Sequence, residues 1–118
     1  MPFIIARVNV PVGKGQETEI KTRMGQAIKL VPGKNESCLM LGIEDSCRFY
    51  LRGNRTQKAA YIEAAVFGNE DHVEFDAFAA ATTDIFHLAL GIPPENIYIR
   101  FDDIKAWSAG GAFIDRNR

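Results

Sequence analysis

The sequence predicts an α/β fold: one domain, residues 1–118, built as a tandem βαβ repeat with a four-stranded mixed sheet and both helices on one face. Two observations support this prediction. A strand-like run, a helix-like run and a second strand-like run follow one another in each half of the chain, at about 1–57 and 58–118. Glu95, which precedes the last strand-like run, also lies half the 118-residue chain length after Glu36, which precedes the second.

The composition is that of an ordinary globular domain and excludes several classes of function. The chain is 47% hydrophobic and 25% charged. Its net charge is −1 and it has no long basic run, so we expect neither nucleic acid nor an anionic membrane as a partner. No apolar stretch reaches the roughly 20 residues of a membrane span, and no signal sequence is recognisable. We therefore expect a cytoplasmic location, with leaderless secretion left open, and reduced Cys38 and Cys47.

The first strand and the first helix are predicted from the beginning of the chain. A β-rich apolar run occupies residues 3–10, and such a run at a terminus normally frays unless it belongs to a sheet. From about Gln16, apolar residues recur at the spacing of one helix face: Ile20, Met24, Ala27, Ile28 and Val31. Pro32–Gly33 then ends the helix.

The second strand is predicted over Ser37–Ile43. Nearly every residue there is apolar, which is typical of a strand covered on both faces, and Cys38 is expected to be a small core residue within it. Residues 45–55 are polar, with a short possible strand at 49–51.

The second half repeats this order. A strand is predicted at 58–67, a helix from about Asp71 to Leu90, and a strand at 96–102. Asp71 and Glu74 resemble a capping box at the start of this helix. Two right-handed βαβ units give a sheet with both helices on one face. Because the 37–43 strand is apolar on both faces, the opposite face needs a cover, and the simplest cover is another copy of the chain.

Pro2 stands where a reactive amine would arise. If the initiator Met is removed, the chain begins with a secondary amine at the mouth of a buried strand. An α-amino group has a pKa of about 8, and partial burial lowers it toward neutrality because the charged form is disfavoured. A rigid amine that is a free base near pH 7 can act as a proton shuttle.

Several motifs at consistent spacing carry a family resemblance. They are Met1–Pro2 before the first strand, Asn9–Val10–Pro11 after it, Gly33–Lys34, Phe67–Gly68, and Pro94–Ile99 at the last strand. With the repeat, they resemble the macrophage migration inhibitory factor family of the tautomerase superfamily over most of the chain. The resemblance implies a homotrimer with active sites at the subunit interfaces, in agreement with the sheet face that needs a cover.

The resemblance also implies an activity and a set of site residues. Pro2 would be the catalytic base of keto–enol tautomerisation, an isomerase reaction, on phenylpyruvate or related 2-oxo acids. Lys34 would hold the carboxylate or polarise the oxygen of the substrate, and Phe67 would form an apolar wall. Tyr98 and Arg100 would come from the neighbouring subunit. Proton abstraction beside a carbonyl needs a base near neutrality and a cation where enolate charge develops, so no metal or organic cofactor is required.

The sequence departs from the family pattern at several positions. Arg100 stands where vertebrate members carry an amide, which would give the pocket a second cation. The vertebrate Cys-x-x-Cys motif is replaced by Ala59 and Ile62. Gly111 occupies the place of an expected aromatic residue, Trp107 lies four residues earlier, and the tail runs past the usual end.

Alternative functions stay open at this stage. The chain could be an interaction protein, a cytokine-like or trimeric binding module with a vestigial pocket. It could also be a hydratase or dehalogenase of the same superfamily, because extra arginines suit unsaturated carboxylates. His72 and His87 have no ligand partners at suitable spacing and are expected to be structural.

Overall fold

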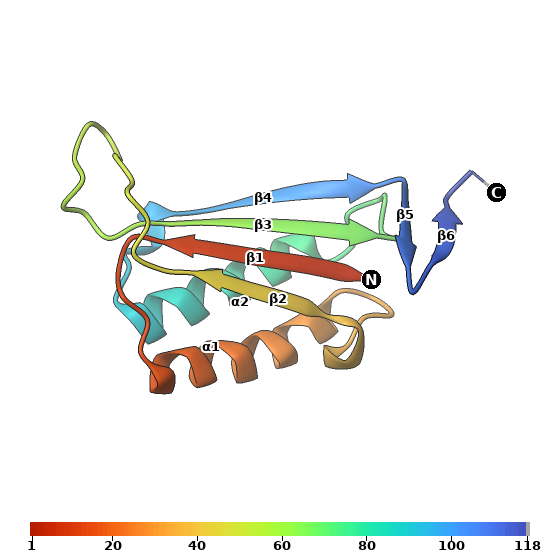
Figure 1. The fold of residues 1–118 in the computed structure, drawn as a ribbon, viewed down its shortest axis with the longest axis horizontal. Coiled ribbons are helices and arrows are strands. Elements are labelled where there is room, and N and C mark those ends of the chain that lie inside the picture. The colour runs from red at the N-terminus through yellow and green to blue at the C-terminus, as the bar shows by residue number, and fades with distance from the viewer. Residues whose placement is uncertain (118) are drawn as a thin grey trace.

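The computed structural model describes residues 1–117, so the last residue of the expected domain, Arg118, lies outside the described range. Figure 1 shows one four-stranded sheet with two helices on one face and a small hairpin beyond its end. The elements are β1 Pro2–Val8, α1 Lys14–Ala27, β2 Met40–Glu44, β3 Ala60–Phe67, α2 Phe75–Leu90, β4 Ile97–Ile104, β5 Ala106–Ala109 and β6 Ala112–Asp115, with 3₁₀ turns η1 Ile28–Leu30, η2 Glu36–Cys38 and η3 Pro94–Asn96. Neither helix of residues 1–117 is long and apolar enough to cross a membrane.

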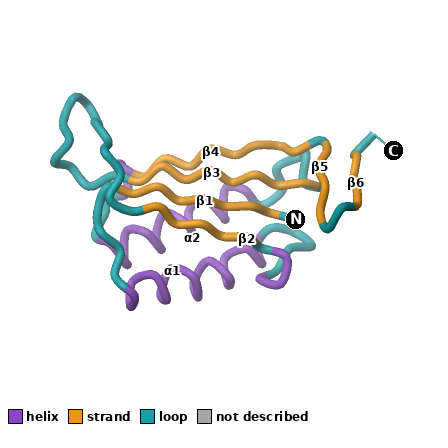
Figure 2. Tube along the Cα trace, viewed as in Figure 1, coloured by secondary structure: helices purple, strands orange, loops and turns teal. Residues whose placement is uncertain are grey.

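The strand order confirms the predicted tandem repeat. It is β2-β1-β3-β4, with β1 parallel to β2, β3 parallel to β4, and β1 antiparallel to β3. Each βαβ unit therefore places its opening strand in the centre of the sheet and its closing strand at an edge, as Figure 2 shows. The antiparallel centre makes the sheet mixed, as the sequence predicts.

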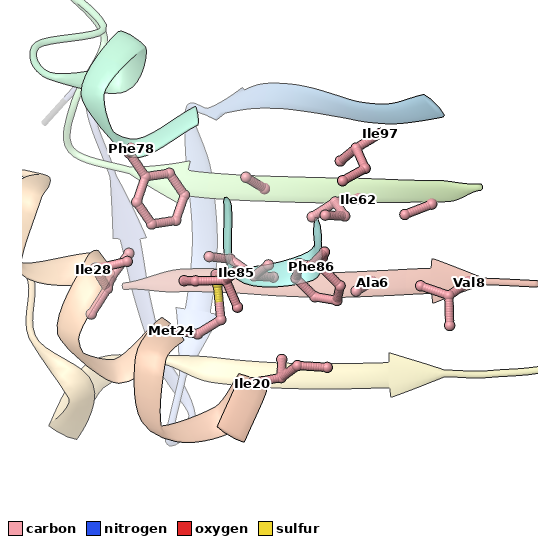
Figure 3. Packing of buried hydrophobic residues seen from close by; sticks show 14 of the residues in the cluster. Ala6, Val8, Ile20, Met24, Ile28, Ile62, Phe78, Ile85, Phe86 and Ile97 are labelled. Carbon is pink, nitrogen blue, oxygen red and sulfur yellow. The ribbon is translucent and has the colours of Figure 1, made fainter. Parts of the chain in front are cut away.

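The core lies between the sheet and the helices (Figure 3). In β1 and β3 every second side chain is buried, and the helices contribute Ile20, Met24, Phe78 and Phe86, which are at most 1% exposed. Fully burying one such apolar side chain stabilises the fold by about 1.5–3 kcal/mol. This packing fixes the central strands, and with them the start of the chain.

The other face of the sheet carries alternate residues of the same strands. One row across it contains Met40, Phe3, Ala65 and Asp102, and Met40 is 67% exposed. In the next rows Arg7 forms ion pairs with Glu44 and Glu63, at 3.2 and 2.6 Å. These ion pairs compensate part of the charge on the open face. Apolar side chains on the same face, such as Met40, remain exposed to solvent.

The second strand differs from the prediction. Residues 37 and 38 belong to η2 rather than to the strand, because the Asn35 side chain accepts a hydrogen bond from Ser37 N at 2.9 Å and starts a 3₁₀ turn. The strand begins at Met40 and forms the edge of the sheet. Cys38 is therefore not a core strand residue: its Sγ lies 3.1 Å from Asn35 O, and the residue is half-buried.

The start of α2 is also a correction. The helix begins at Phe75, and Glu74 precedes it with a left-handed φ of 64° and no capping bond from its side chain, so the predicted Asp71–Glu74 capping box does not form. Asn69 organises the preceding loop instead. Its side chain accepts from Val73 N at 3.0 Å and donates to Val73 O at 2.9 Å.

Two shorter segments complete the comparison. The possible strand at 49–51 is not formed; Leu51 makes an isolated bridge with Asn54. The hairpin β5–β6 was not predicted, and its turn is Gly110–Gly111, both at positive φ (59° and 82°). Two consecutive residues at positive φ form the tight turn that suits a hairpin, and glycine adopts it without steric cost.

Candidate active site

A hollow of about 530 Å³ opens at the end of the sheet where β1 begins. It lies between the start of β1, the segment from η2 to β2, and the hairpin that follows β4. Its lining consists of residues 1–3, Cys38, Met40 and residues 107–110. Most of these side chains are apolar, so the hollow suits a ligand with an apolar part.

Pro2 is buried at the start of β1, opposite Val66 of β3. A proline has no backbone N–H to contribute to the sheet, so the first position of a strand accommodates it at no cost in hydrogen bonds. Strand pairing on both sides of β1 holds this end of the chain in place.

Lys34 comes close to the same point from the loop after η1. Its half-buried side chain donates a hydrogen bond from Nζ to the Phe67 carbonyl oxygen at 2.9 Å. Gly68, the next residue, has a φ of 92°, a backbone conformation that glycine adopts without steric cost. The lysine charge is thus fixed over the end of β3.

The α-amino group at the chain start shows what this environment does to a base. Burial, a hydrogen bond with Lys34 and the charge of that lysine, in this order of size, together lower the pKa of the Met1 amine from 8.0 to about 6. Cys38 opposes the shift weakly. The amine is therefore mainly a free base at pH 7.

Phe67 connects these groups through its backbone. Its carbonyl accepts from Lys34, and its N–H donates to Met1 O at 3.4 Å. The structure therefore brings Pro2, Lys34 and Phe67 of one chain together.

Tyr98 and Arg100 lie elsewhere in the chain. Both are on the open face of β4, and Tyr98 is opposite Tyr61, in the row of Arg7 near the far end of β1. At about 3.3 Å per residue, that row is roughly 16 Å from Pro2 along the strand. Arg100 lies nearer, in the row of Ile5 and Glu63, and neither Tyr98 nor Arg100 lines the hollow within one chain.

Arg100 and Tyr98 each have a defined setting. Arg100 Nε lies 3.1 Å from Asp102 Oδ1, and a hydrogen bond to Tyr61, followed by the charge of Asp102, raises the pKa of the guanidinium. Tyr98 is 54% exposed and lines a second hollow of about 330 Å³ together with Phe49 and Tyr50.

The hollow contains residues that sequence reasoning did not assign to a site. Met40 and residues 108–110 were not singled out, and Trp107 lines the hollow from the unpredicted hairpin. The Gly110–Gly111 pair between short apolar runs was the signal for this hairpin. Within residues 1–117 no three His, Cys, Asp or Glu side chains gather closely enough to hold a metal ion.

Comparison with solved structures identifies the fold. MIF2 of Leishmania major superposes with a TM-score of 0.87 at 21% identity, covering 97% of each chain. A macrophage migration inhibitory factor homologue from Prochlorococcus marinus superposes with a TM-score of 0.83 at 22% identity, covering 94% of this chain and 97% of its own. Pt0534, in a form inactivated by 2-oxo-3-pentynoate, superposes at 0.82 with 13% identity, covering 98% and 96%.

No protein-family model matches the sequence, and no curated protein matches it either. The structural likeness nevertheless extends over nearly the whole chain in each comparison. It confirms the predicted resemblance at the level of the fold: the chain has the fold of macrophage migration inhibitory factor proteins.

Proposed function

We propose that the protein is a keto–enol tautomerase, an isomerase acting on phenylpyruvate-like 2-oxo acids, with the Pro2 nitrogen as general base once Met1 has been removed. One observation carries the proposal: the amine at the chain start lies in an apolar hollow beside Lys34, where its pKa is lowered to about 6. Removal of Met1 places the Pro2 nitrogen at the chain start, next to the same lysine. We expect the same causes, burial and a neighbouring positive charge, to keep it unprotonated at pH 7.

The reaction needs one proton to move from carbon to oxygen. The Pro2 nitrogen takes a proton from the carbon beside the keto group, and the C–H electron pair forms the enolate double bond while negative charge develops on oxygen. Lys34, placed by the Phe67 carbonyl, stabilises that charge. The protonated proline then returns the proton to the enolate oxygen, which gives the enol and regenerates the free base.

We further propose that the working protein is a homotrimer in which Tyr98 and Arg100 of a neighbouring copy complete the pocket. The absence of both residues from the lining of the hollow within one chain supports this proposal, as do the apolar side chains of the uncovered sheet face. Arg100 would bind the substrate carboxylate through two parallel N–H···O bonds.

The comparison with Pt0534 supports a 2-oxo acid as the ligand class, because that protein is inactivated by 2-oxo-3-pentynoate. This compound also provides a test. An unprotonated amine adds to the conjugated alkyne: the N–C bond forms, the amine proton moves to the neighbouring carbon, and no group leaves. We expect one adduct per chain on the Pro2 nitrogen, found by peptide mapping of protein that lacks Met1, together with loss of phenylpyruvate turnover.

Blocking the amine first by acetylation should prevent both the adduct and the turnover. A full yield of adduct on Cys38 or Cys47 with Pro2 unmodified would contradict the proposal, since it would place the nucleophile on a thiol.

A further inference from the structure

A cluster of charges joins the C-terminal hairpin to the sheet at the end where Pro2 lies. Arg116, which directly follows β6, has its Nη1 atom 2.6 Å from Asp103 Oδ2 and 2.8 Å from Glu70 Oε2. Asp103 belongs to β4, and Glu70 to the loop after β3. The Arg116 and Asp103 side chains are 26% and 25% exposed, so solvent screens this pair less than an ordinary surface pair. We call this group the Arg116 clasp.

One residue of the clasp, Asp103, lies in line with the proposed base, Pro2, across the strands of the sheet. Asp103 pairs with Val66 of β3, and Val66 pairs with Pro2 of β1. Asp103 Oδ1 is buried and has no hydrogen-bond partner among residues 1–117. The negative charge of this carboxylate is therefore compensated through Oδ2, which accepts the hydrogen bond from Arg116. Loss of the Arg116 charge would leave this partly buried carboxylate without its ion-pair partner, which disfavours the present arrangement.

The clasp also holds one wall of the hollow. Arg116 N donates to Lys105 O at 2.9 Å and closes the base of the hairpin, in which Trp107 pairs with Ile114. Residues 107–110 of this hairpin line the hollow opposite the start of β1. Figure 1 shows the hairpin beyond the end of the four-stranded sheet rather than within it. Its position relative to Pro2 therefore depends on attachments such as Arg116.

We propose that Arg116 is a positioning residue that sets the substrate preference of the hollow: through Asp103 and Glu70 it holds Trp107 and the rest of the hairpin as the wall against which the aromatic ring of a 2-oxo acid packs. The substrate named in this proposal rests on the proposed function. The ion pairs of the clasp and the lining of the hollow are observed in the structure itself. In this arrangement we expect a phenyl ring to pack against the wall and a short aliphatic chain not to reach it. Loss of the clasp should therefore affect aromatic substrates selectively.

The test uses the full chain without Met1 and the variant Arg116→Gln. Trp107 is the single tryptophan, so its fluorescence reports the hairpin directly. We expect emission shifted to longer wavelength and stronger quenching by acrylamide. We also expect KM for phenylpyruvate to rise about tenfold, a typical effect of losing apolar pocket contacts, with kcat nearly unchanged. KM for 2-oxobutanoate should change less than about twofold, because that chain does not need the wall.

Two further variants serve as controls. Arg116→Lys keeps a charge near Asp103 and should restore part of the phenylpyruvate KM and of the Trp107 emission. Arg55→Gln removes an exposed arginine from the loop between β2 and β3 and should change neither. If Arg116→Gln does not fold, Glu70→Gln weakens the clasp from its more exposed side and should shift the same readouts by smaller amounts.

Three results would overturn the proposal. The first is unchanged Trp107 emission and quenching in Arg116→Gln. The second is an equal rise of KM for both acids, and the third is a change in sedimented mass, which would mean that Arg116 acts on assembly. If the parent protein turns over neither acid, the proposed function fails instead, and the clasp is judged by Trp107 fluorescence and by its quenching on phenylpyruvate binding.

Discussion

At the scale of single residues, the proposed reaction depends on two nitrogen atoms: the amine of the chain start and Lys34 Nζ. Each would carry a positive charge in water, and their proximity together with burial favours a neutral amine. A lowered pKa makes the amine a free base above about pH 6 rather than above about pH 8. Turnover that uses this base should rise with pH through the lowered pKa and then level off.

We expect Lys34→Met to move that rise toward higher pH. The substitution removes the hydrogen bond and the charge that help to lower the pKa of the amine, while burial, the largest cause, remains, so the midpoint should stay below 8.0. The measurement is kcat/KM for phenylpyruvate between about pH 5 and pH 9. Lys29→Met, which replaces an exposed lysine of η1, is the control and should leave the midpoint in place. An unchanged midpoint in Lys34→Met would separate Lys34 from the base.

Arg100 provides the second prediction at this scale. Arg100→Asn should raise KM for a 2-oxo acid by about tenfold or more, the effect of losing a charge-assisted pair worth ~1.5–3 kcal/mol. Steady-state kinetics with phenylpyruvate measure it, and Arg55→Asn serves as the matched surface control. Unchanged KM and kcat would place Arg100 outside the pocket.

At the scale of elements, the loop before α2 depends on one side chain. Asn69→Ala removes two hydrogen bonds of a buried amide to Val73, and we expect it to lower the free energy of unfolding by about 1–3 kcal/mol. Asp71→Ala is the matched control, because Asp71 is exposed and the capping box predicted from it does not form. Urea denaturation of both variants measures the difference. A larger loss in Asp71→Ala would show that the capping box exists in solution.

The same loop illustrates how far the sequence predicts the elements. The sequence predicts strands at 58–67 and 96–102 and a helix that ends at Leu90, and the structure confirms them, with the strands at 60–67 and 97–104. The start of α2 was predicted too early because Asp71 and Glu74 match a capping box, whereas a reciprocal side-chain bond from Asn69 decides the local geometry. Such a bond depends on backbone positions that periodicity does not report.

At the scale of the whole molecule, the candidate site divides into two parts. Pro2, Lys34 and Phe67 meet within one chain, as the resemblance implies, because strand pairing and the Lys34 hydrogen bond are local to one end of the sheet. Tyr98 and Arg100 lie at a different place on the open face. In the proposed trimer a second copy of the chain brings them to the hollow. The spacing of residues within one sequence does not predict how two copies are arranged.

This division leads to a prediction about assembly. Apolar side chains on the open face, such as Met40, favour a homotrimer, as does the position of Tyr98 and Arg100 outside the hollow of one chain. The protein at micromolar concentration should therefore sediment at three times its chain mass of 13.1 kDa. Analytical ultracentrifugation measures this mass. A stable monomer would remove both the trimer and the contribution of a neighbouring Arg100.

The most direct test concerns the amine itself. While Met1 is attached, the Pro2 nitrogen is an amide whose lone pair is delocalised into the carbonyl, so it cannot act as a base near pH 7. Intact mass spectrometry separates preparations with and without Met1, and phenylpyruvate turnover is then measured on each. We predict that the form lacking Met1 is active, that the form retaining it is nearly inactive, and that Pro2→Gly without Met1 is intermediate because a primary amine remains. Equal turnover by the form that retains Met1 would contradict the role of Pro2 as the base.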